Sequence, residues 1–301
     1  MTLLSFHRTI MAEQRWIPET LFDEIGLRTA YAVERVLYET RTEHQHLVLF
    51  EHRHFGKVLM LDGATQVTTR DEFIYHEMMS HVPLLAHGNA REVLIVGGGD
   101  CGIAEEVLKH AGVKRLTQVE IDRSVVDFAK EHFPEFTGPV LSDARFELVI
   151  DDGMHYVAAT DRRFDVIIVD STDPQGPGKV LFSREFYAGC KRCMAPGGVM
   201  VTQNGVPIYQ PEELTKGISK FRRLWADGNC YVAAIPTYVG GHMAMGWATD
   251  DKKLRQVSEQ TIATRYAKAG SFPTKYWSPE MHKAAFAKPR FIQELVDKAK
   301  G

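Results

Sequence analysis

The sequence predicts an α/β protein in which a small N-terminal antiparallel β domain precedes a Rossmann-like, mostly parallel sheet. The segment Val93 to Val96 is a run of four aliphatic residues, typical of a buried parallel strand. A glycine-rich turn (97–102) and a helical pattern (103–110) follow it, and strand and helix patterns then alternate to about Tyr209. Residues 31–69 instead show a period of two, which is typical of antiparallel strands.

The glycine-rich turn predicts a ligand site. A strand, a glycine turn and a helix in this order bring backbone N–H groups close to a nucleotide. The turn reads Gly97-Gly98-Gly99-Asp100-Cys101-Gly102, with a carboxylate at its centre. A carboxylate at Asp100 disfavours a phosphate and favours a cationic ligand. S-adenosylmethionine and its decarboxylated form, which are sulfonium nucleosides, are such ligands.

Acidic residues also lie at or directly after the ends of three further predicted strands. These strands span residues 116–122, 146–150 and 164–169. An acid about twenty residues beyond the glycines is suited to ribose hydroxyls, and we assign that role to Glu120. Asp152 follows the next strand, where it is suited to an adenine amino group, and Asp170 follows the last. Ligands bind at the carboxyl edge of open α/β sheets, so these acids predict one site.

The remaining patterns define the domain organisation. In the N-terminal part, strands are expected at 31–38, 46–54, 57–61 and 64–68, with a hairpin turn at Asp62-Gly63. Asp71 is expected to cap a helix that ends at about His81 before Pro83 breaks it. We therefore divide the chain into a flexible N-terminal extension (1–15), a small β domain with the following helix (16–88), and a Rossmann-like catalytic domain with a C-terminal helical tail (89–301).

Later elements are expected as a helix at 183–194, a fifth strand at 197–203 and a helix at 212–225. A final strand pair at 231–235 and 243–248 precedes tail helices at 254–268 and 289–300. The segment 172–180 is rich in Pro and Gly and is interpreted as a mobile lid, with a plain surface loop as the alternative.

Composition excludes several classes of protein. The net charge of −3 over 301 residues gives no footprint for nucleic acid, and no apolar run has the length of a membrane span. Four scattered cysteines do not form a disulfide scaffold, and Cys190 and Cys193 are interpreted as packing residues of a helix. A cytoplasmic location is expected. Met11 is an alternative to Met1 as the start of translation.

Seven ordered blocks of the chain resemble the spermidine synthase (putrescine aminopropyltransferase) family. Four are the strand-end acids with their neighbours, and the resemblance runs from about Trp16 to the C-terminus. The blocks are Leu61-Asp62-Gly63 with Gln66, Arg70 to Glu77, Gly97 to Asp100, Val119 to Asp122, Asp151 to Gly153, Asp170 to Pro177, and Ile235 to Tyr238. The resemblance implies a methyltransferase-type Rossmann-like fold.

The resemblance also implies roles for individual residues. Contacts with decarboxylated S-adenosylmethionine are expected from Gln45, His76, Gly97, Gly98, Asp100, Glu120, Asp152, Gly153 and Pro177. Contacts with putrescine are expected from Gln66, Tyr75, Asp170, Asp173, Gln203 and Tyr238. Asp170 is the expected base. The alternative for Asp170 and Asp173 is a turn or helix cap, and for the two tyrosines it is a core aromatic whose hydroxyl bonds to backbone.

The implied reaction needs no resident cofactor. An amine of putrescine displaces 5′-methylthioadenosine from the sulfonium donor, which is a co-substrate. No metal is expected, because the histidines at 44, 46, 52 and 54 form a solvated strand face more readily than a metal site. A homodimer or homotetramer is expected. The preferred acceptor stays open among putrescine, cadaverine, a three-carbon diamine and spermidine.

Two positions depart from the family pattern, and three other functions remain as alternatives. The family commonly has Gly where Cys101 stands and Arg where Glu105 stands. Cys101 is expected to be strained if its φ is positive, and either to narrow the donor site or to expose a reactive thiol. The alternatives are a methyltransferase that uses intact S-adenosylmethionine, a non-catalytic nucleoside-binding protein and, less favoured, a nicotinamide dehydrogenase.

Overall fold

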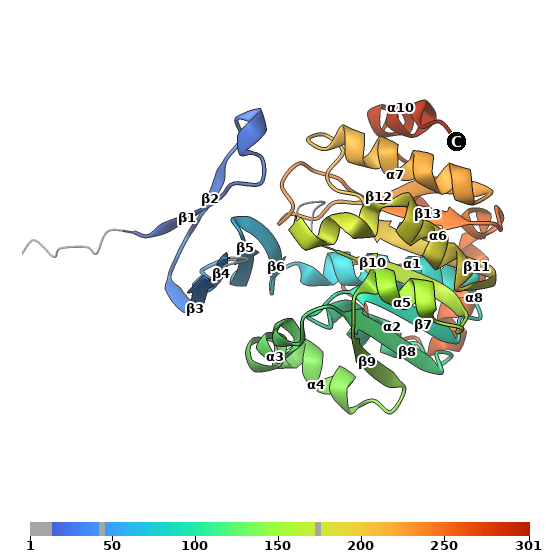
Figure 1. The fold of residues 1–301 in the computed structure, drawn as a ribbon, viewed down its shortest axis with the longest axis horizontal. Coiled ribbons are helices and arrows are strands. Elements are labelled where there is room, and N and C mark those ends of the chain that lie inside the picture. The colour runs from blue at the N-terminus through green and yellow to red at the C-terminus, as the bar shows by residue number, and fades with distance from the viewer. Residues whose placement is uncertain (1–13, 42–45, 172–175) are drawn as a thin grey trace, which may run out of the picture. The chain divides into compact units, whose positions relative to one another are not determined.

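The computed structural model describes residues 14–41, 46–171 and 176–301 (Figure 1). The chain divides into two compact units, Met1–Arg70 and Asp71–Gly301. The division falls before the helix α1 (Glu72–His87), which the sequence-based scheme had grouped with the small β domain. The helix belongs to the larger unit because its buried side chains, such as Met78 and Val82, pack in the core of that unit.

The small unit is antiparallel β structure, as predicted. Strand β1 (Trp16–Glu19) pairs with β2 (Thr29–Ala32), and a short 3₁₀ turn, η1 (Asp23–Ile25), lies between them. The second sheet has the order β3 (Arg35–Arg41), β4 (His46–His52), β5 (Gly56–Leu61) and β6 (Ala64–Thr68). The hairpin turn at Asp62 and Gly63 is confirmed, with φ angles of 48° and 77°.

The single strand expected at 31–38 was wrong. The chain breaks at Val33 and Glu34, and its two halves join different sheets. The side chain of Val33 is buried, and its backbone N–H donates to the Arg15 carbonyl, whereas that of Glu34 donates to Glu51. Alternation of polar and apolar residues cannot reveal such a change of partner, because both halves keep the same period.

The large unit is built on one seven-stranded sheet. Its strand order is β12-β13-β11-β10-β7-β8-β9, in which only β13 runs antiparallel to its two neighbours. This confirms the Rossmann-like, methyltransferase-type sheet. The strands are β7 (Glu92–Gly97), β8 (Arg115–Glu120), β9 (Phe146–Ile150), β10 (Phe164–Asp170), β11 (Met194–Gln203), β12 (Asp227–Ala233) and β13 (Met243–Thr249).

Helices cover both faces of this sheet (Figure 1). Strand β7 shows the division, since Val93 and Ile95 enter one apolar core and Leu94 and Val96 the other. The first core includes side chains of α1, α2 (Gly102–Leu108), α8 (Glu259–Ala269) and α9 (Pro279–Ala285). The second includes side chains of α5 (Gly153–Ala159), α6 (Arg184–Arg192), α7 (Pro211–Leu224) and α10 (Arg290–Lys298).

Helix α1 differs from its prediction at both ends. It continues through Pro83 to His87 and ends at Gly88, whose φ is 78°. Asp71 precedes the first turn, but its carboxylate makes no capping bond. The carboxylate instead accepts hydrogen bonds from the backbone N–H and the hydroxyl of Thr237. Burial of nearly the whole helix outweighs the hydrogen bond that proline removes, which sequence patterns cannot weigh.

Several short elements were not predicted. They are α3 (Arg123–His132), α4 (Pro134–Ser142), α5, α9 and the 3₁₀ segments η2 (Gly176–Phe182) and η3 (Leu254–Gln256). Helix α4 contains Pro134, Gly138 and Pro139, which are poor helix formers, and packing of Phe136 and Val140 stabilises it. Helix α8 begins later than expected, because Ser258 caps it by accepting from the Thr261 N–H.

Three expectations from composition concern the described residues. All four cysteines lie within them, are buried, and form no disulfide. No helix in the described part of the chain is both long and apolar enough to cross a bilayer. Across the same residues, no group of three His, Cys, Asp or Glu side chains is arranged as a metal site. The absence of a metal from the reaction stays a prediction.

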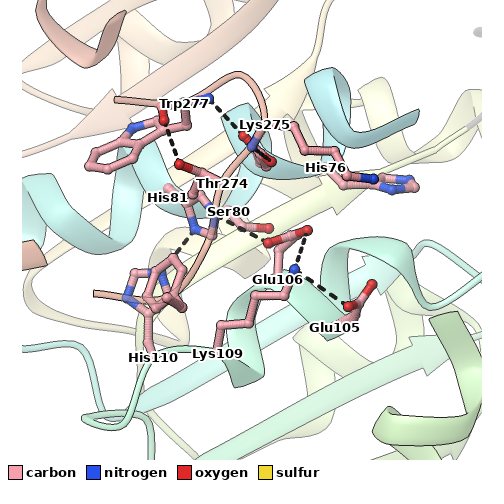
Figure 2. A network of polar contacts seen from close by, with 12 residues as sticks. His76, Ser80, His81, Glu105, Glu106, Lys109, His110, Thr274, Lys275 and Trp277 are labelled. Atoms are coloured by element: carbon pink, nitrogen blue, oxygen red, sulfur yellow. Dashed lines mark hydrogen bonds and ion pairs between the residues drawn. The ribbon is translucent and has the colours of Figure 1, made fainter. Parts of the chain in front are cut away.

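One buried carboxylate attaches the C-terminal tail to helix α1. Glu77 is 2% exposed, and its two oxygens accept from the backbone N–H groups of Lys275, Tyr276 and Trp277 at 2.6–2.9 Å. Lys275 and Trp277 are labelled in Figure 2 beside the helix. Three donors depend on this one side chain, so its removal leaves one buried and two partly buried N–H groups without this acceptor.

We expect Glu77→Ala to lower the free energy of unfolding by about 3 kcal/mol or more, because three charge-assisted hydrogen bonds, one buried and two partly buried, are lost together. Urea unfolding at fixed protein concentration measures the change. Glu212→Ala is the matched control, because Glu212 pairs with Lys216 on an exposed surface of α7 and should change stability by less than about 0.5 kcal/mol. Equal effects of the two substitutions would contradict this account of the tail.

Candidate active site

The site lies at the carboxyl edge of the large sheet, where the ends of β7 and β10 meet. Gly97 and Asp170 are neighbours in the parallel register, and the Gly98 N–H donates to the Asp170 carbonyl at 3.1 Å. Gly97 has a φ of 86°, and a Cβ at this position would lie 2.0 Å from that carbonyl oxygen. Only glycine therefore lets the two strand ends approach this closely.

Asp170 is held by a tyrosine and has an unusual protonation equilibrium. The hydroxyl of Tyr75 on α1 donates to Oδ1 of Asp170 at 2.7 Å. Burial, with the charge of Asp100 as a second cause, raises the pKa of Asp170 to about 7, although Tyr75 and His76 act in the opposite direction. A carboxyl group with a pKa near 7 can accept and release a proton at physiological pH.

His76 and Asp100 form an ion pair beside Asp170. Nε2 of His76 lies 3.5 Å from Oδ2 of Asp100, and Oδ1 of Asp100 accepts from the Gly102 N–H at 2.9 Å. Burial opposes the charge on His76, but the nearby carboxylates of Asp100 and Glu72 raise the pKa of the imidazole well above its ordinary value. Burial opposes the charge on Asp100 as well, and His76 lowers the pKa of that carboxyl.

Glu120, Asp152 and Gly153 lie at the ends of the neighbouring strands, as predicted. Glu120 is 8% exposed, and Oε1 accepts from the Asp122 N–H at 3.1 Å, while burial raises the pKa of its carboxyl. Asp152 caps α5, with Oδ1 accepting from the Met154 N–H at 2.7 Å. A structural role therefore occupies one oxygen of Asp152, and its second oxygen is oriented by that cap.

The residues expected to bind the amine substrate lie in both units of the chain. The ring of Tyr238 lies edge-on to Tyr75 with centroids 5.9 Å apart. Gln203 at the end of β11 donates from Nε2 to the Ser171 carbonyl at 3.3 Å and accepts from the Gly205 N–H at 2.8 Å. Gln66 belongs to the small unit, where Nε2 donates to the Ala64 carbonyl at 3.2 Å.

Some predicted positions lie outside the described residues. They are Gln45, residues 172–175 of the proposed lid, which include Asp173, and the side chain of Pro177. The residues that the structure does bring together are Tyr75, His76, Asp100, Glu120 and Asp170, since each is within electrostatic reach of at least one other. Four elements that are distant in sequence therefore contribute to one acidic site.

Sequence reasoning gave no role to two residues that support this site. Glu72, at the start of α1, accepts from Nδ1 of His76 at 2.8 Å. Gln118, on β8, donates from Nε2 to the carbonyls of Gly97 and Gly98 at 3.1 and 2.6 Å. Two signals were available in the sequence. One is the i,i+4 spacing of Glu72 and His76, and the other is an amide side chain within a strand predicted to be buried.

The two departures from the family pattern have defined environments. Cys101 has a φ of 65°, so the expected strain at a non-glycine residue is present. Its side chain is fully buried, and burial, reinforced by Asp100 and Glu120, raises the pKa of the thiol to about 12. The alternative of an exposed, reactive thiol was therefore wrong. Nζ of Lys109, the residue that follows α2, lies 3.4 Å from Oε1 of Glu105, and burial raises the pKa of the Glu105 carboxyl.

Comparisons with known proteins cover most of the chain. A family model described as the spermine/spermidine synthase domain matches residues 72–258, and one described as the spermidine synthase tetramerisation domain matches residues 16–69. Polyamine aminopropyltransferase 1 of Pseudomonas aeruginosa is 49% identical over 280 residues, which cover 93% of this chain and 97% of that protein. The polyamine aminopropyltransferase of a Ruegeria species is 50% identical over 285 residues, covering 95% and 99%.

Two similar solved structures are spermidine synthases. Spermidine synthase in complex with the transition-state analogue AdoDATO has a TM-score of 0.88 and 31% identity, and the match covers 95% of this chain and 96% of that one. Spermidine synthase from Thermotoga maritima has a TM-score of 0.86 and 30% identity, covering 95% of both chains. The fold and the site thus define a transferase of the aminopropyltransferase class. The chain belongs to the spermine/spermidine synthase family.

The buried cysteines give a direct test of the site's packing. The pKa of the Cys101 thiol is about 12, and burial raises those of Cys193 and Cys230 to about 11. Because the thiolate is the reactive species, we expect iodoacetamide at pH 8 to label the native protein about a hundredfold or more slowly than the urea-unfolded protein. Mass spectrometry of peptides identifies each site. Rapid labelling of Cys101 in the native protein would contradict the buried position of its thiol.

Proposed function

We propose that the protein transfers the aminopropyl group of decarboxylated S-adenosylmethionine to putrescine, giving spermidine and 5′-methylthioadenosine. The observation that carries the proposal is the placement of Asp170, a buried carboxyl with a pKa of about 7, beside the second carboxylate of Asp100. This pair suits a reaction in which a cationic donor and a cationic acceptor meet. Names of the relatives support aminopropyl transfer, and putrescine is our own assignment.

The proposed step is an in-line displacement. The amine nitrogen attacks the carbon next to sulfur, the C–S bond breaks, and its electron pair stays on sulfur, so that neutral 5′-methylthioadenosine leaves. The sulfonium is already a good leaving group, and no metal or resident cofactor is needed. The enzyme must position the two reactants and remove one proton, because a free diamine with amine pKa values near 10 is almost fully protonated at neutral pH.

Asp170 is the proposed acceptor of that proton. Its Oδ1 is held by the Tyr75 hydroxyl, so the carboxylate has a fixed direction. Arrival of two cations lowers the pKa of Asp170, which favours the ionised base in the complex. Tyr238, edge-on to Tyr75, and Gln203 extend the acceptor region, and Asp173 and Gln66 are proposed partners of the distal ammonium.

The donor is proposed to lie across the neighbouring strand ends. Gly97 and Gly98 let the donor lie close to the protein backbone. Glu120 binds the ribose hydroxyls, and Asp152 with Gly153 binds the adenine. Asp100, with His76 at 3.5 Å, binds the aminopropyl ammonium. Gln45 and Pro177 are proposed to complete the donor site.

The same acids argue against the use of intact S-adenosylmethionine. That molecule carries a carboxylate near the position where the decarboxylated donor has none. Two like charges about 4 Å apart repel by roughly 4 kcal/mol at an effective dielectric constant near 20. His76 offsets part of this repulsion, but Glu72 on its other nitrogen and the nearby Glu120 leave the site with an excess of carboxylates.

Assembly and location complete the proposal. The small unit matches a family model described as a tetramerisation domain, so we propose a homo-oligomer, either a dimer or a tetramer, built through that unit. A cytoplasmic location is part of the same proposal. The defining experiment incubates the protein with decarboxylated donor and a panel of three-, four- and five-carbon diamines and spermidine, with the products identified by mass. Fastest turnover with putrescine supports the proposal, and products made only from spermidine would redirect it to spermine synthesis.

We expect Asp170→Asn to reduce turnover about a hundredfold or more, because the amide cannot accept the proton, while 5′-methylthioadenosine still binds. In the wild-type protein, kcat/KM is expected to rise with pH through about 7, because Asp170 must lose its proton to act as a base and its pKa in the unliganded site is about 7. Stopped assays across pH 5.5–9 and calorimetry with the nucleoside provide the two readouts.

Asp165→Asn is the matched control for this substitution. Asp165 is the second residue of the same strand, and its Oδ2 accepts from the backbone N–H groups of Arg91 and Glu92 at 2.7 and 3.0 Å, at the end opposite to the carboxyl edge. The Asp165→Asn variant should be less stable than the wild type but should keep the acidic limb of the kcat/KM profile. Wild-type turnover by Asp170→Asn at neutral pH would remove Asp170 from the mechanism.

We expect Asp100→Ala to weaken binding of the decarboxylated donor and to reduce discrimination against intact S-adenosylmethionine. The dissociation constant of intact S-adenosylmethionine divided by that of the decarboxylated donor should fall about tenfold or more. The carboxylate of Asp100 no longer repels the carboxylate of S-adenosylmethionine, while His76 remains to attract it. Competition binding of both nucleosides to the wild type and the variant measures the ratio. An unchanged ratio would mean that charge repulsion at Asp100 does not select the donor.

A further inference from the structure

His76, which pairs with Asp100, also contacts the carboxylate of Glu72. Glu72 is the first residue of α1, and its Oε2 lies 2.8 Å from Nδ1 of His76, one helical turn later. The side chain of Glu72 is 9% exposed and that of His76 is 4% exposed, so the contact is shielded from solvent. A buried pair of this kind is screened far less than a surface i,i+4 pair, so Glu72 has a strong influence on the state of the ring.

The ring of His76 is fixed from several sides. Its Cε1 lies so close to the backbone of Gly102 that a Cβ there would be 2.1 Å away. Phe136 of α4 lies edge-on to it, with centroids 5.9 Å apart, and Tyr75 lies at the same distance. Figure 2 shows the side chain of His76 pointing away from the His81 and His110 pair of the same region. With the ring held in this way, Nε2 must face Asp100.

The geometry determines which nitrogens of His76 carry protons. Nδ1 faces Oε2 of Glu72 at 2.8 Å, and Nε2 faces Oδ2 of Asp100 at 3.5 Å. Each nitrogen must be an N–H to face a carboxylate favourably, because a neutral ring would direct a lone pair at one of them. The pKa of His76, raised well above its ordinary value by these carboxylates against the effect of burial, agrees with the imidazolium form.

We propose that Glu72 is a positioning residue that keeps His76 doubly protonated and its Nε2–H directed at Asp100, and so sets the charge of the pair to which the donor's aminopropyl ammonium binds. This inference rests on the proposed function for its kinetic consequence only. Glu72 touches neither substrate in this scheme and acts through His76.

The charged groups around His76 determine the expected direction of change. They are Glu72 on its own helix, Asp100 on the glycine turn, Asp170 at the end of β10, and Glu105 on α2, which interacts with Glu72. The charge of His76 lowers the pKa of Asp170, whereas that of Asp100 raises it. Loss of the proton from His76 should therefore raise the pKa of Asp170 and delay its ionisation to higher pH.

Glu72→Gln separates charge from hydrogen bonding. The amide oxygen still accepts from Nδ1, so the ring keeps its orientation, but the negative charge that favours the second proton is gone. In the nucleoside-free protein, nitrogen NMR of the histidine rings should show the pKa of His76 falling by about one pH unit or more. Loss of the corresponding signal in His76→Gln assigns the resonance. Glu72→Asp, which restores the charge on a shorter side chain, should recover part of the change.

The kinetic readout follows from the same change. The acidic limb of the kcat/KM profile should move to higher pH in Glu72→Gln, with a smaller change in the plateau at high pH, where Asp170 is ionised in both proteins. A merely structural role for Glu72 would lower activity at all pH values alike. Partial return of the limb in Glu72→Asp supports control through charge.

Glu106→Gln is the matched control. Oε2 of Glu106 on α2 lies 3.1 Å from Nε2 of His81 on α1, and Nδ1 of His81 lies 3.0 Å from Nε2 of His110 (Figure 2). This second buried pair joins α1 to α2, whereas Glu72 and His76 both belong to α1, and it does not face the carboxyl edge of the sheet. The substitution should lower stability and leave both the titration of His76 and the pH profile unchanged.

The outcomes distinguish this inference from the proposed function. An ordinary His76 titration in the wild type, or one that Glu72→Gln leaves unaltered, overturns the role of Glu72 even if aminopropyl transfer is confirmed. Equal effects of Glu106→Gln and Glu72→Gln on the titration overturn it as well. If no diamine is aminopropylated but the His76 titration depends on Glu72, the proposed function fails and the control of charge by Glu72 is supported.

Discussion

The site depends on holding several carboxylates close together at one edge of a sheet. Asp100, Glu120 and Asp170 repel one another there, and burial adds to the cost of their charges, as the raised pKa values of Glu120 and Asp170 show. Two groups offset this repulsion. The imidazolium of His76 lies among the carboxylates, and the hydroxyl of Tyr75 donates a hydrogen bond to Asp170. A cationic ligand is the natural partner of such a site, since it relieves the repulsion on binding.

The rest of the large unit keeps these groups in place. The Gly97 backbone lets the ends of β7 and β10 meet, and Gln118 fixes the carbonyls of the glycine turn from the neighbouring strand. Helix α1 supplies Tyr75, which donates to Asp170, and His76, which pairs with Asp100 of the turn. Its own position is fixed by Asp71, which accepts from Thr237, and by Glu77, which accepts from the tail. Acidic side chains of one helix therefore serve both the architecture and the site.

Much of the fold and the site could be predicted from sequence because the signals are local. Aliphatic runs, the glycine turn and Asp62-Gly63 identified the strands of the large sheet and one hairpin, and each strand-end acid lies where its strand stops. Helix boundaries were less predictable. Pro83 lies inside α1, and α4 forms despite its prolines, because the packing of surrounding side chains outweighs intrinsic propensity.

The sequence by itself determined the class of sheet, the acids at its carboxyl edge and the resemblance to one enzyme family, since all three depend on residue type and spacing along the chain. Only the tertiary structure decided the protonation chemistry. The raised pKa of Asp170, the imidazolium of His76 between Glu72 and Asp100, and the inert thiol of Cys101 arise from burial and from neighbours distant in sequence. Electrostatic interactions depend on distance and dielectric environment, and both are fixed only when the chain is folded.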